Sequence, residues 1–295
     1  MLDLRYLAGL VEEHSEALEA NVSPLTLRGR TLPFGQRPVL MGVINLSPDS
    51  WYRESVCLNP ESAVRRGRVL AAQGADLVDV GAESTLAHAA RVEDALQESR
   101  LLPVVRELAA AGLLVSVETY SARVARAALE AGASVINLTG TAEADAVYEL
   151  VAAHDAAVIL CYVQGPHVRA VGDFVFTPDL LRTMHESFAR EIERARHRGV
   201  EKIILDPGLG FYYRNLQDSA ARVRHQMRVF LHTFRLRTLG CPVCHALPHA
   251  FEYFGEEVRC AEPFFAVLAA LGRTDLFRTH EIPRVKAVLD TLQIF

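Results

Sequence analysis

Several features that define common classes of protein are missing from this chain of 295 residues. The formal net charge is −5, so the chain has no excess of positive charge for binding nucleic acid. No apolar run is long enough to span a membrane, and the N-terminus carries acidic residues where a signal peptide needs a basic start. Cysteine is scarce, and five scattered thiols do not form a disulfide framework. These absences predict a cytoplasmic protein with no nucleic-acid or membrane partner.

A glycine-rich dinucleotide-binding fingerprint is also absent after the first predicted strand. Short runs rich in β-branched residues instead alternate with longer helical patterns. Strands that alternate with helices indicate a parallel sheet. Eight such strands in a chain of this length indicate an α/β fold, a (β/α)8 TIM barrel with an N-terminal helical extension. The predicted strands cover residues 38–45, 75–81, 113–119, 133–139, 156–162, 202–208, 242–247 and 275–280.

Helix boundaries support the same alternation. Asn59 and Ser121 stand where a helix needs an N-cap, and several helical patterns end in glycine. The first residues carry an amphipathic pattern, which predicts a helix packed against the barrel bottom or a partner subunit. Residues 22–35 then form a short hairpin or lead-in. We therefore expect an N-terminal helix and lead-in segment over residues 1–35 and a barrel over residues 36–295.

Polar side chains gather at the carboxyl ends of the predicted strands, where a TIM barrel holds its catalytic groups. The first strand, within VLMGVINLSPDSW (39–51), passes from a buried apolar run to Asn45 and a polar loop. A single polar residue at a strand end is usually a cap, but a whole set on one rim favours a functional site. The other members of the set are Glu83, Ser84, Thr85, Glu118, Thr119, Asn137, Gln164, Asp206, Arg278 and His280.

These motifs resemble those of the dihydropteroate synthases and the wider pterin-binding family. MGVINLSPDSW and ADLVDVGAEST resemble the first two family signatures, and VSVETY, GASVINLTG, ILDPGLGF and RTHEI match later strand ends in order. The resemblance covers roughly residues 36–290. It implies a transferase of folate biosynthesis that uses Mg²⁺, joins a dihydropterin methyl pyrophosphate to p-aminobenzoate and releases pyrophosphate. It also implies a possible homodimer.

The resemblance assigns roles at the anion end of the site. Asn45 matches the residue that contacts the metal, and a hard cation with an oxygen ligand is consistent chemistry. Arg278 and His280 match the pair that holds the anion, and these three residues are the expected catalytic set. Arginine suits this task because its planar donors fit phosphate oxygens. Thr85 matches a hydroxyl in the same anion region.

The resemblance also assigns a pterin end. Asp206 matches the carboxylate that accepts the two adjacent N–H donors of a pterin, and Asn137 matches the amide that reads the neighbouring ring edge. Phe211 matches a pocket residue. Glu118 stands where the family has aspartate, and its extra methylene extends the carboxylate by about 1.5 Å.

Departures from the family pattern lie near the second substrate and the closing loops. Residues 86–87 are Leu-Ala instead of Arg-Pro, and residues 248–250 are Pro-His-Ala instead of Ser-Arg-Lys. Residues 161–162 are Cys-Tyr instead of Met-His, and residues 53–55 are Arg-Glu-Ser instead of Asp-Gly-Gly. Two interpretations stay open. The chain is a transferase for p-aminobenzoate or a related amine, or it is a pterin-binding protein without synthase activity, such as a sensor, a subunit or a methyltransferase relative.

Two smaller questions concern individual side chains. Arg214 and His249 either replace the missing positive charge or lie in solvent. The C-x-x-C-H pattern at residues 241–245 resembles haem-attachment and zinc motifs. It lies on a predicted strand, where residues three apart point to opposite faces and stand roughly 10 Å apart. Core packing is therefore the favoured interpretation of both cysteines.

Overall fold

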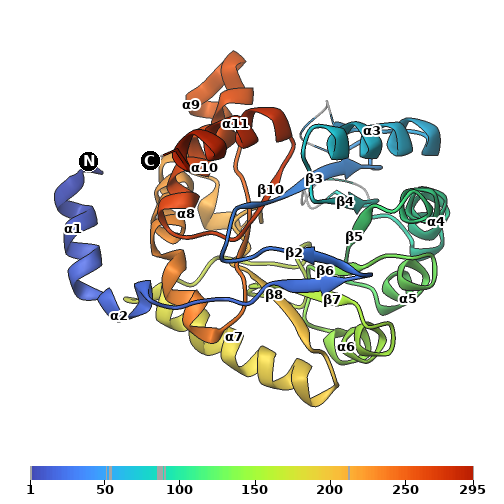
Figure 1. Cartoon of the computed structure of the whole chain (residues 1–295), viewed down its shortest axis with the longest axis horizontal. Helices are drawn as coiled ribbons and strands as arrows, with labels where there is room; N and C mark the ends of the chain where they lie inside the picture. Colours follow the sequence, from blue (N-terminus) through green and yellow to red (C-terminus); the bar gives the residue numbers. More distant parts are fainter. Residues whose placement is uncertain are drawn as a thin grey trace.

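The computed structural model describes residues 2–50, 52, 55–84, 89, 91–211 and 213–294. Eight parallel strands form a nearly closed barrel with helices around it, which confirms the predicted TIM barrel (Figure 1). The strand order around the barrel is β8-β7-β6-β5-β4-β3-β10-β9, and a parallel bridge between Leu205 and Val243 joins its two edges. The strands are β3 (Val39–Asn45), β4 (Leu77–Gly81), β5 (Leu114–Thr119), β6 (Val135–Leu138), β7 (Ala157–Cys161), β8 (Lys202–Asp206), β9 (Cys244–Ala246) and β10 (Leu276–Thr279).

Helices cover the outside of the barrel and begin at the caps that the sequence predicts. The backbone N–H of Ser62 donates to Asn59 Oδ1 over 2.8 Å, and Val124 N donates to Ser121 Oγ over 3.4 Å. Short elements lie in the connections between strands and longer helices: η2 (Arg214–Leu216), η3 (Thr233–Leu239), α9 (Phe251–Phe254) and η4 (Gly255–Cys260). The longer helices are α3 (Pro60–Ala72), α4 (Asp94–Ala110), α5 (Ala122–Glu130), α6 (Ala144–Ala153), α7 (Leu180–His197), α8 (Ser219–His232), α10 (Ala261–Leu271) and α11 (Ile282–Leu292).

A hairpin of β1 (Leu25–Leu27) and β2 (Arg30–Leu32) confirms the predicted turn of the lead-in. Its apolar side chains form one buried cluster with the first residues of the barrel strands, including Val39 and Leu77. Phe34, fully buried, belongs to the same cluster. The hairpin therefore closes the amino end of the barrel, and the carboxyl end is left for a site.

The N-terminal helix does not pack against the bottom of the barrel, so this one of the two predicted positions is wrong. In α1 (Leu4–Glu13) the hydroxyl of Tyr6 bonds His232 Nε2 of α8 over 3.0 Å, and Leu10 is the buried residue of the helix. Figure 1 shows α1 beside the barrel, joined to it through α2 (Ser15–Leu18), which contacts η3. The hairpin excludes α1 from the bottom because it already covers that end.

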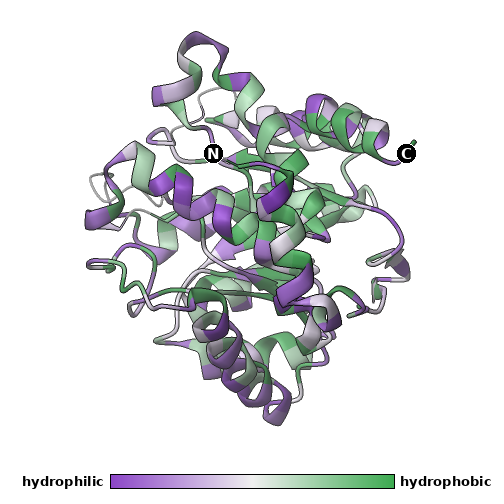
Figure 2. Cartoon of the chain, turned by 90° about the vertical axis from the view of Figure 1, so that its left-hand side faces the viewer, coloured by the Kyte–Doolittle hydropathy of each residue, from purple (hydrophilic) through white to green (hydrophobic). Residues whose placement is uncertain are grey.

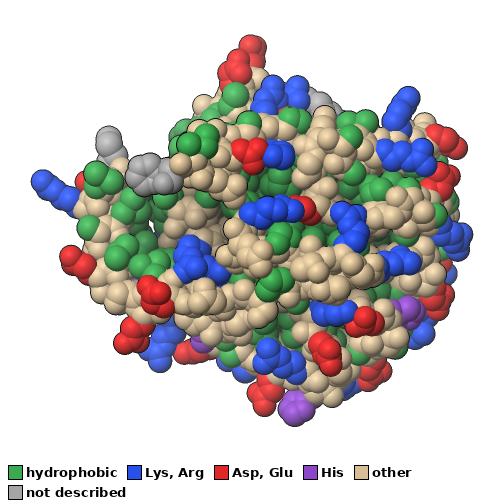
Figure 3. Space-filling view, viewed as in Figure 1, with side chains coloured by type: hydrophobic (Ala, Val, Ile, Leu, Met, Phe, Trp, Pro, Cys, Tyr) green, Lys and Arg blue, Asp and Glu red, His purple; other side chains and the backbone are tan. Residues whose placement is uncertain are grey.

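Apolar and charged side chains are distributed as expected for a barrel. In Figure 2 the central strands are mostly hydrophobic, and the helices carry hydrophilic residues on their outer sides. Acidic and basic side chains are intermingled on the face shown in Figure 3. None of the helices in the described chain has both the length and the apolar character needed to cross a membrane. Cys241 and Cys244 are buried free thiols, which confirms their predicted core packing.

Candidate active site

A cavity of about 260 Å³ is lined by residues at the carboxyl ends of the barrel strands. Parallel strands of a barrel end at one rim, so the side chains that follow them converge there. Thr85 lies outside the described residues, as do positions 53–54 and 86–87. The predicted residues that line the cavity are Asn45, Glu83, Ser84, Glu118, Asn137, Asp206, Phe211, Arg278 and His280.

Two of the lining residues, Asn137 and Arg278, donate to a buried carboxylate that sequence analysis did not identify. Asp79 lies in the middle of β4 and has no exposed surface. It accepts hydrogen bonds from Arg278 Nε over 2.7 Å, Ser116 Oγ over 2.6 Å and Asn137 Nδ2 over 3.2 Å. Asp79 thus fixes two of the predicted site residues. The signal in the sequence is a single aspartate within the apolar run LVDVG.

Arg278 occupies the predicted site but is already held by two carboxylates. Besides its bond to Asp79, its Nη2 donates to Glu118 Oε2 over 2.5 Å. The longer side chain of Glu118 makes this contact with a guanidinium on β10, across the barrel from β5. Since a guanidinium has five N–H donors, three remain without a hydrogen bond inside the described chain and can bind an anion.

Two carboxylates in the cavity have raised pKa values. Burial raises the pKa of Asp206 to about 6, while the backbone N–H of Gly208, donating over 2.7 Å, opposes the shift. Burial also raises the pKa of Glu118 to about 7, with Arg278 opposing and the charge of Asp79 adding to the shift. Loss of hydration makes these negative charges costly. A ligand that donates N–H groups to them would replace the lost water.

Small and apolar groups form the wall around Asp206. Gly208 has a φ of +73°, and a Cβ there would lie 2.3 Å from the carbonyl oxygen of Tyr162. Phe211 is packed beside it and lines the cavity. Cys161 donates weakly from its thiol to Asn137 Oδ1 over 3.4 Å, and burial raises the pKa of this thiol. The wall is thus suited to a flat ring whose polar edge meets Asp206.

Asn45 lies at the end of β3, and its amide oxygen is available as a metal ligand. Its Nδ2 donates to Ser55 Oγ over 2.6 Å, and Ser55 Oγ donates to the carbonyl of Tyr52 over 2.7 Å. These bonds orient the amide, and nothing in the described chain donates to its Oδ1. One amide oxygen fits Mg²⁺, which takes few protein ligands and completes its shell with water and phosphate oxygens.

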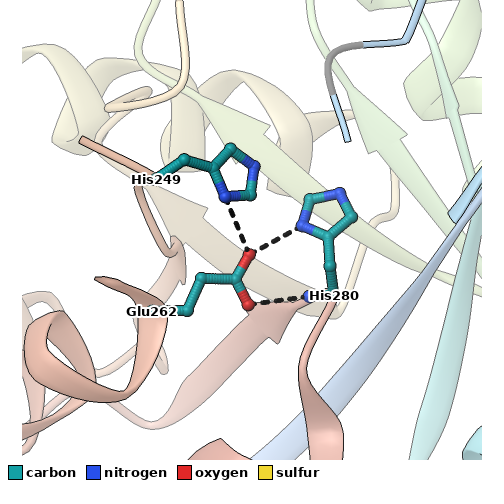
Figure 4. A group of neighbouring side chains, drawn as sticks. All are labelled: His249, Glu262 and His280. Atoms are coloured by element: carbon teal, nitrogen blue, oxygen red, sulfur yellow. Dashed lines mark hydrogen bonds and ion pairs between the residues drawn. The ribbon is translucent and has the colours of Figure 1, made fainter. Parts of the chain in front are cut away.

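His280 is supported by a buried glutamate that sequence analysis also missed. Its Nδ1 lies 2.7 Å from Glu262 Oε1, and its backbone N–H donates to Glu262 Oε2 over 2.9 Å (Figure 4). His249 Nδ1 lies 3.5 Å from the same Oε1. Burial lowers the pKa of His280 to about 3 and that of His249 to about 4, and it raises the pKa of Glu262. No sequence spacing links Glu262 to either histidine, which explains why it was missed.

The two candidate replacements for the missing positive charge have different outcomes. Arg214 is 77% exposed and lies 3.6 Å from Asp173, so it is a solvated side chain. His249 lies in the cavity wall beside Ala250, where the family pattern has lysine. Arg222 of α8 also lines the cavity and donates to Glu252 Oε1 over 2.6 Å. Sequence analysis did not consider Arg222, because it lies one turn into a helix rather than at a strand end.

Comparison with known proteins decides the family. Residues 41–247 match the family described as pterin binding enzyme, which is more than half of the chain. The chain belongs to the pterin-binding enzyme family. Its barrel is similar to a dihydropteroate synthase from Xanthomonas albilineans, solved with 4-aminobenzoic acid, with 30% identity and a TM-score of 0.77. That alignment covers 93% of this chain and 98% of the other.

Curated relatives agree with this assignment. The pterin-binding enzyme is 27% identical over 271 residues to a dihydropteroate synthase from Synechocystis sp., covering 88% of this chain and 90% of the relative. It is 35% identical over 175 residues to a dihydropteroate synthase from Mycobacterium leprae, covering 58% and 62%. The resemblance found in the sequence is therefore confirmed, and the chain is an enzyme of the dihydropteroate-synthase type.

Proposed function

We propose that this pterin-binding enzyme takes a dihydropterin methyl pyrophosphate together with Mg²⁺ and couples it to p-aminobenzoate or a related amine. Its dihydropteroate-synthase-like role in folate biosynthesis follows from its relatives, and the substrates and the metal are the proposal. Solved dihydropteroate synthases from Xanthomonas albilineans contain 4-aminobenzoic acid in one case and 7,8-dihydropteroate in another. These two ligands support an aromatic amine and a pterin as the substrate classes.

The observation that carries the proposal is the buried carboxylate of Asp206. It is 5% exposed and lines the same cavity as Asn137. The aminopyrimidine edge of a pterin presents two adjacent N–H donors, and one carboxylate accepts both. Two charge-assisted hydrogen bonds would offset the cost of burying Asp206, which is the cost that raises its pKa to about 6.

The other end of the cavity has groups suited to a diphosphate. Arg278 offers three N–H donors, and Asn45 offers its amide oxygen to Mg²⁺. When bound, Mg²⁺ would neutralise negative charge that develops on the diphosphate oxygens. Arg278 would donate to the same oxygens, and its two carboxylate partners would hold it in one orientation.

The proposed reaction is a substitution at the methylene carbon of the pterin. The amine nitrogen forms a bond to this carbon, and the carbon–oxygen bond breaks. The diphosphate leaves with the electron pair, and the amine nitrogen loses a proton. Asp206 binds and orients the ring, and Arg278 stabilises the leaving group, so most of the barrier is reduced by positioning and electrostatics.

Isothermal titration calorimetry tests the proposal. The protein is titrated with 6-hydroxymethyl-7,8-dihydropterin pyrophosphate in the presence of Mg²⁺, and p-aminobenzoate is then added while released diphosphate is assayed. Saturable binding followed by diphosphate release is the expected result. Pterin binding without release would support the alternative, a pterin-binding protein without synthase activity or with another amine as substrate. Absence of pterin binding would refute the proposal.

A matched pair of variants assigns the binding to Asp206. Asp206→Asn replaces one carboxylate oxygen by an N–H donor that would face the N–H groups of the pterin, and we expect binding to be lost. Asp173→Asn is the same change at a side chain that is 63% exposed, and it should bind like the wild type. Equal affinity of both variants would remove Asp206 from the pterin site.

A further inference from the structure

Three side chains from three different elements meet beside the cavity. His249 follows β9, Glu262 lies in the first turn of α10, and His280 follows β10. One ligand atom from each lies within 4.8 Å of the others. Figure 4 shows both imidazole rings turned toward one carboxylate oxygen of Glu262. Two imidazoles and a carboxylate form a nitrogen-rich ligand set that differs from the single amide oxygen of Asn45.

Glu262 is held in place by donors on its far side. Its side chain is 1% exposed. Its Oε2 accepts from Thr279 Oγ1, from the backbone N–H of His280 over 2.9 Å and from that of Glu281 over 3.2 Å. Its Oε1 is left facing the two imidazoles. Outer hydrogen bonds of this kind orient carboxylate ligands in metal sites.

The imidazoles are also fixed by packing. The ring of Tyr52 stacks on His249 with centroids 4.9 Å apart and packs against His280 at 4.7 Å. The Tyr52 hydroxyl bonds Glu281, whose carboxylate also accepts from Arg259 over 2.6 Å and 3.0 Å. The histidine rings therefore have little rotational freedom. Ligands that are already oriented lose less entropy when they bind an ion.

The charge of the cavity gives a reason for a cation at this point. The described lining includes four acidic side chains and two arginines. Both arginines already pair with a carboxylate, Arg222 with Glu252 and Arg278 with Glu118. A diphosphate adds further negative charge, and a second cation beside the Mg²⁺ proposed at Asn45 would help to balance it. The four acidic side chains are Glu83, Glu118, Asp206 and Glu252.

We propose that His249, Glu262 and His280 bind one divalent transition-metal ion such as Zn²⁺. Three N and O ligands are the set of a zinc site that keeps its fourth position open for water or substrate. Imidazole favours transition metals over Mg²⁺, so this ion is distinct from the one proposed at Asn45. Binding of the metal stands without the proposed function. An interaction of the bound metal ion with a diphosphate oxygen rests on the proposed function.

Metal titration without pterin tests the inference. Full-length protein without a polyhistidine tag is freed of metal with a chelator and titrated with Zn²⁺ by calorimetry. Co²⁺ then replaces Zn²⁺, and its visible absorption reports the coordination number. We expect one ion per chain and the strong absorption of four-coordinate Co²⁺. Absence of saturable binding would overturn the inference and leave Glu262 as a hydrogen-bond support for the two histidines.

Variants assign the ion to the three side chains. His249 lies on a loop after β9, so the variant His249→Ala should fold. We expect its affinity for Zn²⁺ to be at least about tenfold weaker than that of the wild type. Glu262→Gln should do the same, and unfolding curves in urea show whether it folds. His197→Ala removes a histidine that is 77% exposed and should change nothing. Wild-type affinity in both His249→Ala and Glu262→Gln would refute the assignment.

The two proposals fail separately. Loss of pterin binding with Zn²⁺ binding intact would remove the proposed function and keep the metal site. Pterin binding and diphosphate release in a chain that binds no Zn²⁺ would remove the metal site and keep the function.

Discussion

Substitution of Asp79 by asparagine tests whether one buried carboxylate organises the active site. Asp79 is fully buried and accepts from Arg278, Ser116 and Asn137. In Asp79→Asn, the amide oxygen can keep the bond from Ser116. The amide N–H groups would then face the donors of Arg278 and Asn137, so two bonds are lost and a guanidinium loses one of its two anionic partners.

The magnitude follows from what remains around Arg278. Removing one partner of a buried ion pair costs about 3–5 kcal/mol, because a buried charge is left uncompensated. Arg278 keeps Glu118 at 2.5 Å, which favours the lower end of that range. We expect the free energy of unfolding to fall by about 3 kcal/mol, and the variant should still fold because domains are typically stable by about 5–15 kcal/mol. Displacement of Arg278 by about 1 Å would also lower the rate on the order of a hundredfold.

Urea unfolding and diphosphate release measure the two effects. Asp145→Asn is the control, since Asp145 pairs with Arg194 and Arg198 on the outside of the barrel with 40% of its side chain exposed. That variant should unfold like the wild type and keep its rate. An Asp79→Asn variant with wild-type stability would refute the reasoning, because it would mean that Glu118 alone compensates Arg278.

Two further predictions concern the cavity wall around Asp206 and Gly208. Because burial raises the pKa of Asp206 to about 6, the folded chain binds a proton there more tightly than the unfolded chain, and wild-type stability loses this contribution as the pH rises through 6. Asp206→Asn should therefore gain stability relative to the wild type as the pH rises from about 4 to about 6 in urea unfolding, and a pH-independent difference would contradict the raised pKa. Gly208→Ala should destabilise the fold more than Gly112→Ala. Both glycines have positive φ, +73° and +79°, which costs about 1–2 kcal/mol for alanine, but only the Cβ at position 208 meets a carbonyl, at 2.3 Å. Equal losses of thermal stability in the two variants would show that the backbone around residue 208 shifts to accommodate the methyl group.

The barrel could be predicted from the sequence because its strands are buried on both faces. A parallel strand in this position is an apolar run without alternation, and VLMGVIN and KIILD are such runs. All eight predicted strands are present, and their ends differ from the predicted ones by at most two residues. The strand ends then located the cavity, because a barrel brings them to one rim whatever the loops contain.

Contacts between side chains could not be predicted in the same way. Asp79 meets Arg278 over a sequence separation of 199 residues, and no periodicity relates two strands across a barrel interior. Glu262 meets His280 because the first turn of α10 packs against the end of β10, which depends on the angle of the helix. The position of α1 was missed for a related reason. Its apolar stripe shows that one face is covered but does not identify the surface that covers it.

Some departures from the family pattern, at Glu118 and Cys161, lie on strands, and others lie in loops beyond the strand ends. Residues that match the family pattern, such as Asn137 and Arg278, lie on strands whose neighbours hold them in register. The departures at residues 248–250 lie in a segment after β9 that has left the ladder, where Ala250 has a φ of +45°. Loops beyond the strand ends can change without altering the core. The site residues on the strands, such as Asn137 and Arg278, are therefore constrained by the fold, and the segment after β9 is free to exchange arginine and lysine for other side chains.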